Sequence, residues 1–228
     1  MLAREEIDVV LLSLKVAFWA VAASLPLAIA VGFVLARKDF PGKTLFDAAV
    51  HLPLVLPPVV VGFALLVLFG REGPIGRVLE PLGVVFAFRW TGAALAAAIM
   101  GFPLMVRAVR LAIEAVDTRL ESAGRTLGAS RTRVFFTVTL PLAWPGVVTG
   151  AILAFARSLG EFGATVTFVS NIPGETQTLP LAIYSFTQVP GQDAQVVRLC
   201  ILAVVLSLAA LAFSEWLMRR GRAEVPHD

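Results

Sequence analysis

The sequence predicts an all-α membrane protein, and two observations support this fold class. Of the 228 residues, 58% are hydrophobic and only 15% are charged, whereas a soluble domain carries roughly 25% charged residues. The apolar residues also gather in long stretches, and a helix needs about 20 mostly apolar residues to cross a bilayer. Because no Ser/Gly-rich or charged linker divides the chain, we expect a single domain over residues 1–228.

Several apolar stretches are long enough to cross a membrane as helices. We place these predicted spans at residues 10–36, 45–70, 91–113, 146–169 and 195–217. A sixth, re-entrant helix has room within residues 175–192, so the prediction is five or six transmembrane helices.

The start of the chain, MLAREEIDVV, lacks the basic region and the cleavage site of a signal peptide. We therefore expect the first helix to remain in the protein.

The distribution of Lys and Arg residues predicts how the helices are oriented. Basic residues lie between the first two spans, around the third connection and after the last span, whereas residues 170–197 contain no Lys or Arg. Because basic loops stay inside, we expect the C-terminus and the 117–142 connection to be cytoplasmic and the N-terminus to be outside. Three arginines on the predicted outer side do not fit this rule: Arg71, Arg77 and Arg89. The basic residues form no patch, so the net charge of +3 does not indicate a nucleic-acid partner.

Prolines interrupt the second and third predicted spans. Pro53, Pro57 and Pro58 fall inside the second span, and Pro103 follows Gly101 by two residues in the third. An interior proline removes a backbone hydrogen bond and clashes with the preceding turn. In lipid, the freed carbonyls must be satisfied by neighbouring protein or by water in a cavity. Two interpretations stay open: a broken helix beside a pathway, or a tolerated kink.

The fourth predicted span opens with two small residues at helical spacing. Gly146 and Gly150 are four residues apart, which lets two helix backbones approach closely. This pattern predicts helix packing more strongly than a role in transport.

A polar connection over residues 117–142 separates the third and fourth spans. Its first part, Asp117–Gly128, predicts a short helix of about 18 Å, too short to cross a bilayer. Glu121 and Arg125 are four residues apart on it, so we expect them to pair weakly. Gly128 is a natural helix stop because glycine accepts the left-handed conformation. Ala123 and Gly124 predict a smooth exposed surface that fits a cleft in a partner, although an ordinary loop has the same periodicity.

The second part of this hairpin predicts another short helix. Ser130 can cap its N-terminus, and we expect the Leu140-Pro141 dipeptide to end it before the fourth span begins.

The hairpin resembles the EAA loop of ABC-transporter permeases, whose pattern is E-A-A, three residues, G, nine residues and I-x-L-P. Aligned on Gly128, the pattern falls on Ser122, Ala123, Gly124, Val138, Leu140 and Pro141. Two positions depart from it: the motif Glu is Ser122 here, with Glu121 one place earlier, and the second Ala is Gly124. These departures put in doubt any salt bridge expected of the motif Glu. The resemblance implies a coupling helix that docks in a groove of an ATPase subunit.

Longer strings extend the resemblance over almost the whole chain. FPGKTLFDAAVHLPLVLPPVVVGFALL, GFPLMVRAVRLAIE and LAFARSLGEFGATVTFVSNIPGETQTLPLAIY are similar to permeases of the molybdate branch. Sulfate and thiosulfate permeases share an LGEFG-like core. The resemblance implies a type I ABC-transporter transmembrane domain in a bacterial cytoplasmic membrane. It implies ATP-driven import of a tetrahedral oxyanion, most closely molybdate, with sulfate, thiosulfate and tungstate as alternatives.

The resemblance also implies partners. We expect a homodimer with the anion path between its subunits, an ATPase pair that uses ATP and Mg²⁺ on the cytoplasmic side, and a periplasmic or extracellular binding protein that meets the outer face near residues 171–174. This chain is then a transport subunit, surrounded by lipid, with no enzymatic activity, cofactor or metal of its own. The string GKT at residues 42–44 supports this expectation, because Arg37 stands where a P-loop needs glycine.

Charged residues of the fourth predicted span are candidates for the path. Arg157 and Glu161 are four residues apart, and an unpaired charge at mid-membrane costs roughly 2.5–3.5 kcal/mol, so we expect them to pair on one helix face. Either this pair only fixes helix packing, or Arg157 and Ser158 line the path while Glu161 holds the arginine. In the second case Arg157→Ala abolishes uptake and leaves assembly intact. Pro57 and Pro58 are the other path candidates.

Two functions outside this family remain open. A secondary transporter needs gradient-driven uptake without an ATPase, and its usual inverted repeats are not apparent. A membrane-embedded enzyme needs a polar catalytic cluster inside the spans, where only Arg157 and Glu161 qualify.

Overall fold

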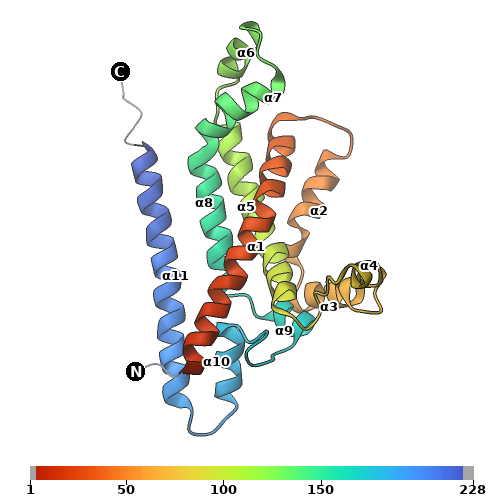
Figure 1. Ribbon diagram of the computed structural model, residues 1–228. Helices are drawn as coiled ribbons and strands as arrows, with labels where there is room; N and C mark the ends of the chain where they lie inside the picture. Colours follow the sequence, from red (N-terminus) through yellow and green to blue (C-terminus); the bar gives the residue numbers. More distant parts are fainter. Residues whose placement is uncertain (1–3, 223–228) are drawn as a thin grey trace.

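The computed structural model describes residues 4–222, which contain helices and no strand. Residues 1–3 and 223–228 of the predicted domain lie outside the described part. Long helices run side by side in a bundle, with the short helix α6 beyond one end and the start of α1 at the other (Figure 1). We refer to these as the α6 end and the opposite end.

Long apolar helices form the frame of the bundle. Within the described residues, helices of membrane-spanning length and hydropathy comprise α1 (Arg4–Arg37), α5 (Trp90–Glu114), a continuous helix over Arg131–Leu159, and α11 (Asp193–Arg222). Long helices therefore cover the residues of the predicted spans at 10–36, 91–113 and 195–217. Their prediction succeeded because a long apolar run in lipid must satisfy its backbone hydrogen bonds internally, which a helix does.

The predicted second span is two helices. α2 (Lys43–Val55) and α3 (Pro58–Phe69) meet at a bend of 110°. Leu56 and Pro57 are extended between them, because a residue that precedes a proline is disfavoured in the helical region. The second span is thus broken at its prolines, whereas Pro103 lies inside an uninterrupted α5. The short helices α4 (Pro74–Leu79) and η1 (Glu80–Leu82) follow α3.

The predicted boundaries of the fourth span are wrong at both ends. α7 (Arg131–Val134), a π-helical turn (Phe135–Thr139) and α8 (Leu140–Leu159) form one helix, so the Leu140-Pro141 dipeptide does not end it. The wider π turn just before Pro141 provides a physical reason, since such turns accommodate an interrupted hydrogen-bond ladder.

After Leu159 the chain breaks again, and two short helices follow. α9 spans Gly163–Val169 and α10 spans Leu179–Thr187. α10 occupies the region where a sixth helix had room, but its nine residues are only about 14 Å long and cannot cross a bilayer.

Close packing of α1, α5 and α8 builds the core, and glycine makes it possible. A Cβ on Gly146 would collide with the side chain of Ala112 in α5, and one on Gly150 would lie 3.0 Å from the Cβ of Ala108. The packing role predicted for these two glycines is therefore what the structure shows.

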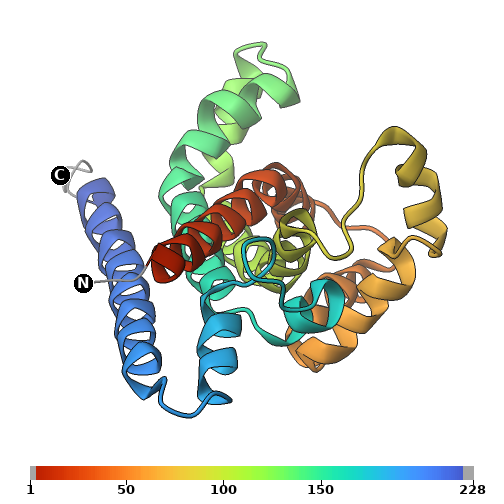
Figure 2. The same ribbon diagram turned by 60° about the horizontal axis from the view of Figure 1, so that its bottom comes forward.

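A long-range ion pair fastens α11 to the start of α1. Arg198 donates to the buried carboxylate of Glu6 at 2.7 Å. Beyond this contact, α11 packs on α8 and α10, and its outer face, which includes Val204 and Leu208, is exposed. Figure 2 shows α11 at one edge of the bundle and the α2–α3 unit at another.

Candidate functional site

The two helix breaks lie against each other. A Cβ on Gly163, the first residue of α9, would lie 2.8 Å from the Cβ of Pro58 at the start of α3. One turn further along α3, a Cβ on Gly62 would lie 2.8 Å from the Cα of Ala164. α3 and α9 are neighbours in both views (Figures 1 and 2). The structure thus brings the predicted proline break and the predicted charged segment to one place.

Arg157 and Glu161 form the ion pair that their spacing predicted, in a different geometry. Arg157 Nη1 lies 2.7 Å from Glu161 Oε2. However, α8 ends at Leu159, so the two residues do not share a helix face, and this part of the prediction is wrong. The Glu161 side chain is 2% exposed and that of Arg157 is 30% exposed. The pair therefore places a buried carboxylate behind a partly exposed cation.

Glu161 has a second partner that explains its burial. Its Oε1 accepts a hydrogen bond of 2.9 Å from the backbone N–H of Ala164. A side-chain acceptor just before a helix satisfies N–H groups that the helix start leaves without a partner. A negative charge at this end of a helix also interacts favourably with the helix dipole. Glu161 consequently caps the start of α9 and neutralises Arg157 at the same time.

Ser158 lies away from the surface of the break. It is buried, and its hydroxyl donates to the carbonyl of Ala97 in α5 at 3.4 Å. Of the two residues predicted to line a path together, only Arg157 is accessible in the single chain. Pro57 is exposed and Pro58 is partly covered.

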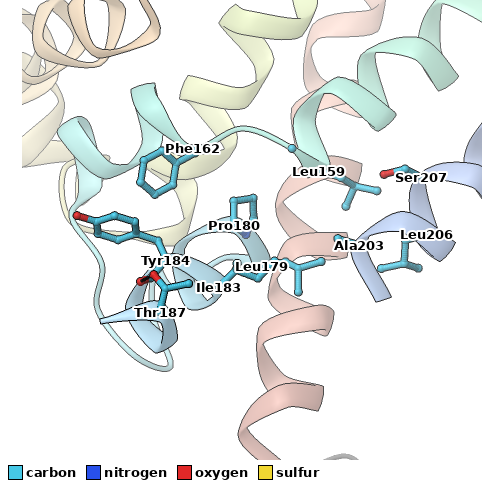
Figure 3. A pocket seen from close by; sticks show the side chains of 11 residues that line it. Leu159, Phe162, Leu179, Pro180, Ile183, Tyr184, Thr187, Ala203, Leu206 and Ser207 are labelled. Carbon is cyan, nitrogen blue, oxygen red and sulfur yellow. Dashed lines mark hydrogen bonds between the residues drawn. The ribbon is translucent and has the colours of Figure 1, made fainter. Parts of the chain in front are cut away.

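A groove of about 420 Å³ adjoins this break, between the end of α8, α10 and α11 (Figure 3). The rings of Phe162 and Tyr184 pack at 5.3 Å between centroids along it, and Ser207 and Thr187 add hydroxyl groups. Among the described residues no cation lines the groove, so they offer packing surface and no counter-charge for an anion. This groove could not be predicted from the sequence, because its walls come from three separate segments and only one of them, the apolar LPLAIY string, stands out.

The hairpin at the α6 end follows local capping rules. α6 spans Thr118–Thr126, and the Asp117 side chain accepts from the N–H of Arg119 at 2.8 Å. Gly128 has φ +86°, and Ser130 Oγ accepts from the N–H of Arg133 at 3.2 Å. The predicted short helix, glycine stop and serine cap are all present.

Glu121 pairs with α1 and not with Arg125, so the predicted local pair is wrong. Arg37 lies 3.1 Å from Glu121 Oε1 and also donates to the carbonyl of Val116 at 2.8 Å. The hydroxyl of Thr139 donates to the same Glu121 oxygen at 2.9 Å. Both charged side chains are about 15% exposed, and a largely buried charge is costly unless it has a partner. Arg125 instead donates to the Ser122 hydroxyl at 3.0 Å.

The outward surface of α6 is apolar. Leu127 is 89% exposed and Leu120 is 49% exposed, and Ala123 lies on the exposed side with them. Gly124 faces inward, where a Cβ would lie 3.2 Å from Val134, so its predicted part in a smooth exposed surface is wrong. Val138, Leu140 and Pro141 lie within the long helix that follows.

Membrane-length helices, paired helix breaks and a protruding short helix define a transmembrane subunit of the transporter class. Residues 26–222 match the family described as "Binding-protein-dependent transport system inner membrane component". The chain belongs to this family.

Named relatives agree with that assignment. The chain is 60% identical over 218 residues to the molybdenum transport system permease protein ModB of Escherichia coli (strain K12), covering 95% of each chain. It is 59% identical over 216 residues to ModB of Haemophilus influenzae, covering 94% of each. It is 41% identical over 155 residues to the sulfate transport system permease protein CysW of Synechococcus elongatus, covering 68% of this chain and 54% of that one.

A solved structure supports the fold. The crystal structure of a bacterial alginate ABC transporter in complex with an alginate pentasaccharide-bound periplasmic protein matches with a TM-score of 0.75 at 16% identity, covering 96% of this chain and 80% of that one. The fold is that of a type I ABC-transporter transmembrane domain.

The Arg37–Glu121 pair predicts a measurable coupling between α1 and α6. Arg37→Gln and Glu121→Gln, made singly and together, should give a coupling energy of about 1–3 kcal/mol, because each single change leaves a partly buried charge without its partner. Thermal unfolding of the purified chain in detergent measures it. Arg77 and Glu72 form a matched, largely exposed pair that should show almost no coupling. Additive effects at Arg37 and Glu121 would contradict the role assigned to this pair.

Proposed function

We propose that this chain is the permease subunit of an ATP-driven importer that carries molybdate across a bacterial cytoplasmic membrane. The observation that carries the proposal is the 60% identity to a molybdenum transport permease over 95% of both chains. The partly exposed Arg157 beside two helix breaks adds a cation where an anion can approach the protein interior.

The proposed assembly is a homodimer with the path between its subunits. α2 has no buried residue in the single chain, and Val55 and Phe63 beside the break are strongly exposed. A second copy that covers this face would enclose the region around Arg157, Pro57 and Pro58. Because irregular backbone is tolerated in a membrane only where it is buried or lines a cavity, this arrangement also accounts for the break.

The proposed orientation places the α6 end in the cytoplasm. Basic residues gather there, at Arg37, Lys38, Arg125 and Arg131, whereas Glu5 and Asp8 lie at the opposite end beside Gly174. By the positive-inside rule the N-terminus is then outside, and a soluble binding protein would deliver the oxyanion near residues 171–174.

The exposed leucines of α6 are the proposed contact with an ATPase subunit. A separate ATPase pair would bind ATP and Mg²⁺, and this chain would need no cofactor of its own. The Arg37–Glu121 pair would then pass the motion of α6 to α1, and the continuous helix Arg131–Leu159 would pass it to the break.

Sulfate is the alternative substrate, and the relation to a sulfate permease supports it. Molybdate, tungstate and sulfate are all tetrahedral dianions, so one arginine cannot rank them by charge alone. Selection by the binding protein is compatible with every contact described above.

Transport by the reconstituted system tests the substrate. The chain is purified with its ATPase and binding protein, placed in liposomes and supplied with molybdate, tungstate or sulfate. We expect ATP-dependent uptake of molybdate and stimulation of ATP hydrolysis by it. Stimulation of ATP hydrolysis by sulfate alone would show that sulfate is the substrate in place of molybdate. Failure of the chain to bind any ATPase would refute the proposal of an ATP-driven importer.

Leu127→Asp tests the docking surface. The change places a charge in an apolar contact, so we expect recovery of the ATPase with the purified permease to fall about tenfold or more, while the permease itself stays folded. Leu82→Asp is the control, because Leu82 is 72% exposed and lies outside the hairpin. Equal recovery of the ATPase with both variants would show that α6 is not the contact.

The double variant Arg157→Gln with Glu161→Gln separates a path role from a packing role. It removes both charges yet leaves an oxygen at position 161 to accept from Ala164, so the complex should assemble. If the charge of Arg157 serves the anion, molybdate uptake falls about tenfold or more. Glu6→Gln with Arg198→Gln neutralises a distant pair as a control and should leave uptake unchanged. Normal molybdate uptake by the Arg157 and Glu161 double variant would show that the pair serves only helix packing.

A further inference from the structure

A second hollow lies at the α6 end, separate from the helix breaks. Its volume is about 320 Å³, and it lies between the end of α1, α6 and α7. Four cations and one carboxylate line it: Arg37, Lys38, Arg125, Arg131 and Glu121. Its charge is therefore strongly positive.

The single carboxylate of this hollow is already engaged. Glu121 accepts from Arg37 and from Thr139, and Arg125 is oriented by the Ser122 hydroxyl. Within residues 4–222, the side chains of Lys38 and Arg131 have no hydrogen bond or ion pair. Two cations thus remain free to bind an anion that the chain itself does not supply.

The hollow lies at the boundary of the membrane-spanning helices. α1 ends at Arg37, and the next long helix on this side begins at Arg131. The long side chains of Lys and Arg near the ends of membrane-spanning helices reach the interface between hydrocarbon and water. This position at the helix ends brings the free cations within reach of lipid headgroups.

The walls of the hollow suit an amphiphilic occupant. Phe33 and Phe135 line it, and their rings pack edge to face at 4.8 Å. A small free ion would use the cations and leave these rings unused. A phospholipid would use both, with its phosphate at the cations and its glycerol and first methylene groups along the rings.

We propose that this hollow binds the phosphate of an anionic phospholipid, held by Lys38 and Arg131 with Arg125 as a third contact. Basic pockets between helices at the cytoplasmic surface are suited to such headgroups. Because Arg125 and Glu121 belong to α6, a bound lipid would join the membrane surface to the element that holds the hairpin in place.

Lipid binding to the full chain tests this site. The protein in detergent is titrated with phosphatidylglycerol, phosphatidylcholine or inorganic phosphate, and bound lipid is detected by native mass spectrometry. We expect phosphatidylglycerol to bind and the other two to bind at least tenfold more weakly. Lys38→Ala with Arg131→Ala should weaken phosphatidylglycerol binding about fivefold for each cation removed. Both side chains are exposed, so the variant should fold.

The control variant is Arg119→Ala with Arg133→Ala, which removes the same charge from exposed residues outside the hollow. It should bind phosphatidylglycerol like the parent chain. Equal weakening in both double variants, or equal affinity for phosphatidylcholine or inorganic phosphate, overturns the site. Loss of ATPase contact with retained lipid binding in the Lys38 and Arg131 variant would make the hollow a protein contact instead. The lipid measurement needs no ATPase, so it stands or falls independently of the importer.

Discussion

In a bilayer, every backbone N–H and C=O group must find a partner inside the protein, and this constraint shapes the region where the helices break. The two interruptions cover each other, with Gly163 on Pro58 and Gly62 on Ala164. Glu161 then supplies the acceptor that the start of α9 lacks, and its charge is matched by Arg157. The charged pair is thus tied to the break, since a buried helix start without a cap would be costly.

The same demand for internal partners acts at the α6 end, with a different outcome. Glu121 is held by Arg37 and Thr139, so three segments far apart in sequence meet at one carboxylate. Within residues 4–222, Lys38 and Arg131 have no comparable partners, and the leucines on the outer side of α6 are exposed. The polar groups that find partners within the chain fix the position of the hairpin. The groups that the hairpin leaves exposed are available to lipid or protein.

Sequence reasoning succeeded where a feature depends on neighbouring residues. The lengths of α1, α5 and α11 follow from apolar runs, and the stop at Gly128 and the cap at Ser130 follow from backbone conformation at a single residue. It failed where distant segments compete. Arg125 follows Glu121 by four residues, the spacing of a local ion pair in a helix, but Arg37 in α1 pairs with Glu121 instead. The Leu140-Pro141 dipeptide suggested a helix end, but the preceding π turn absorbs the proline. The contact between the two breaks depends on tertiary packing, which neither proline nor glycine patterns reveal alone.

The Arg37–Glu121 link has one more consequence. A short helix on a flexible loop would have to be immobilised when it meets another molecule, and ordering a side chain or loop opposes association. Here much of that ordering is complete once the chain has folded, because α6 is already tied to α1 and to the helix that follows it. α6 is therefore preorganised. The conformational entropy of the hairpin is lost during folding, so this loss no longer opposes binding to another molecule.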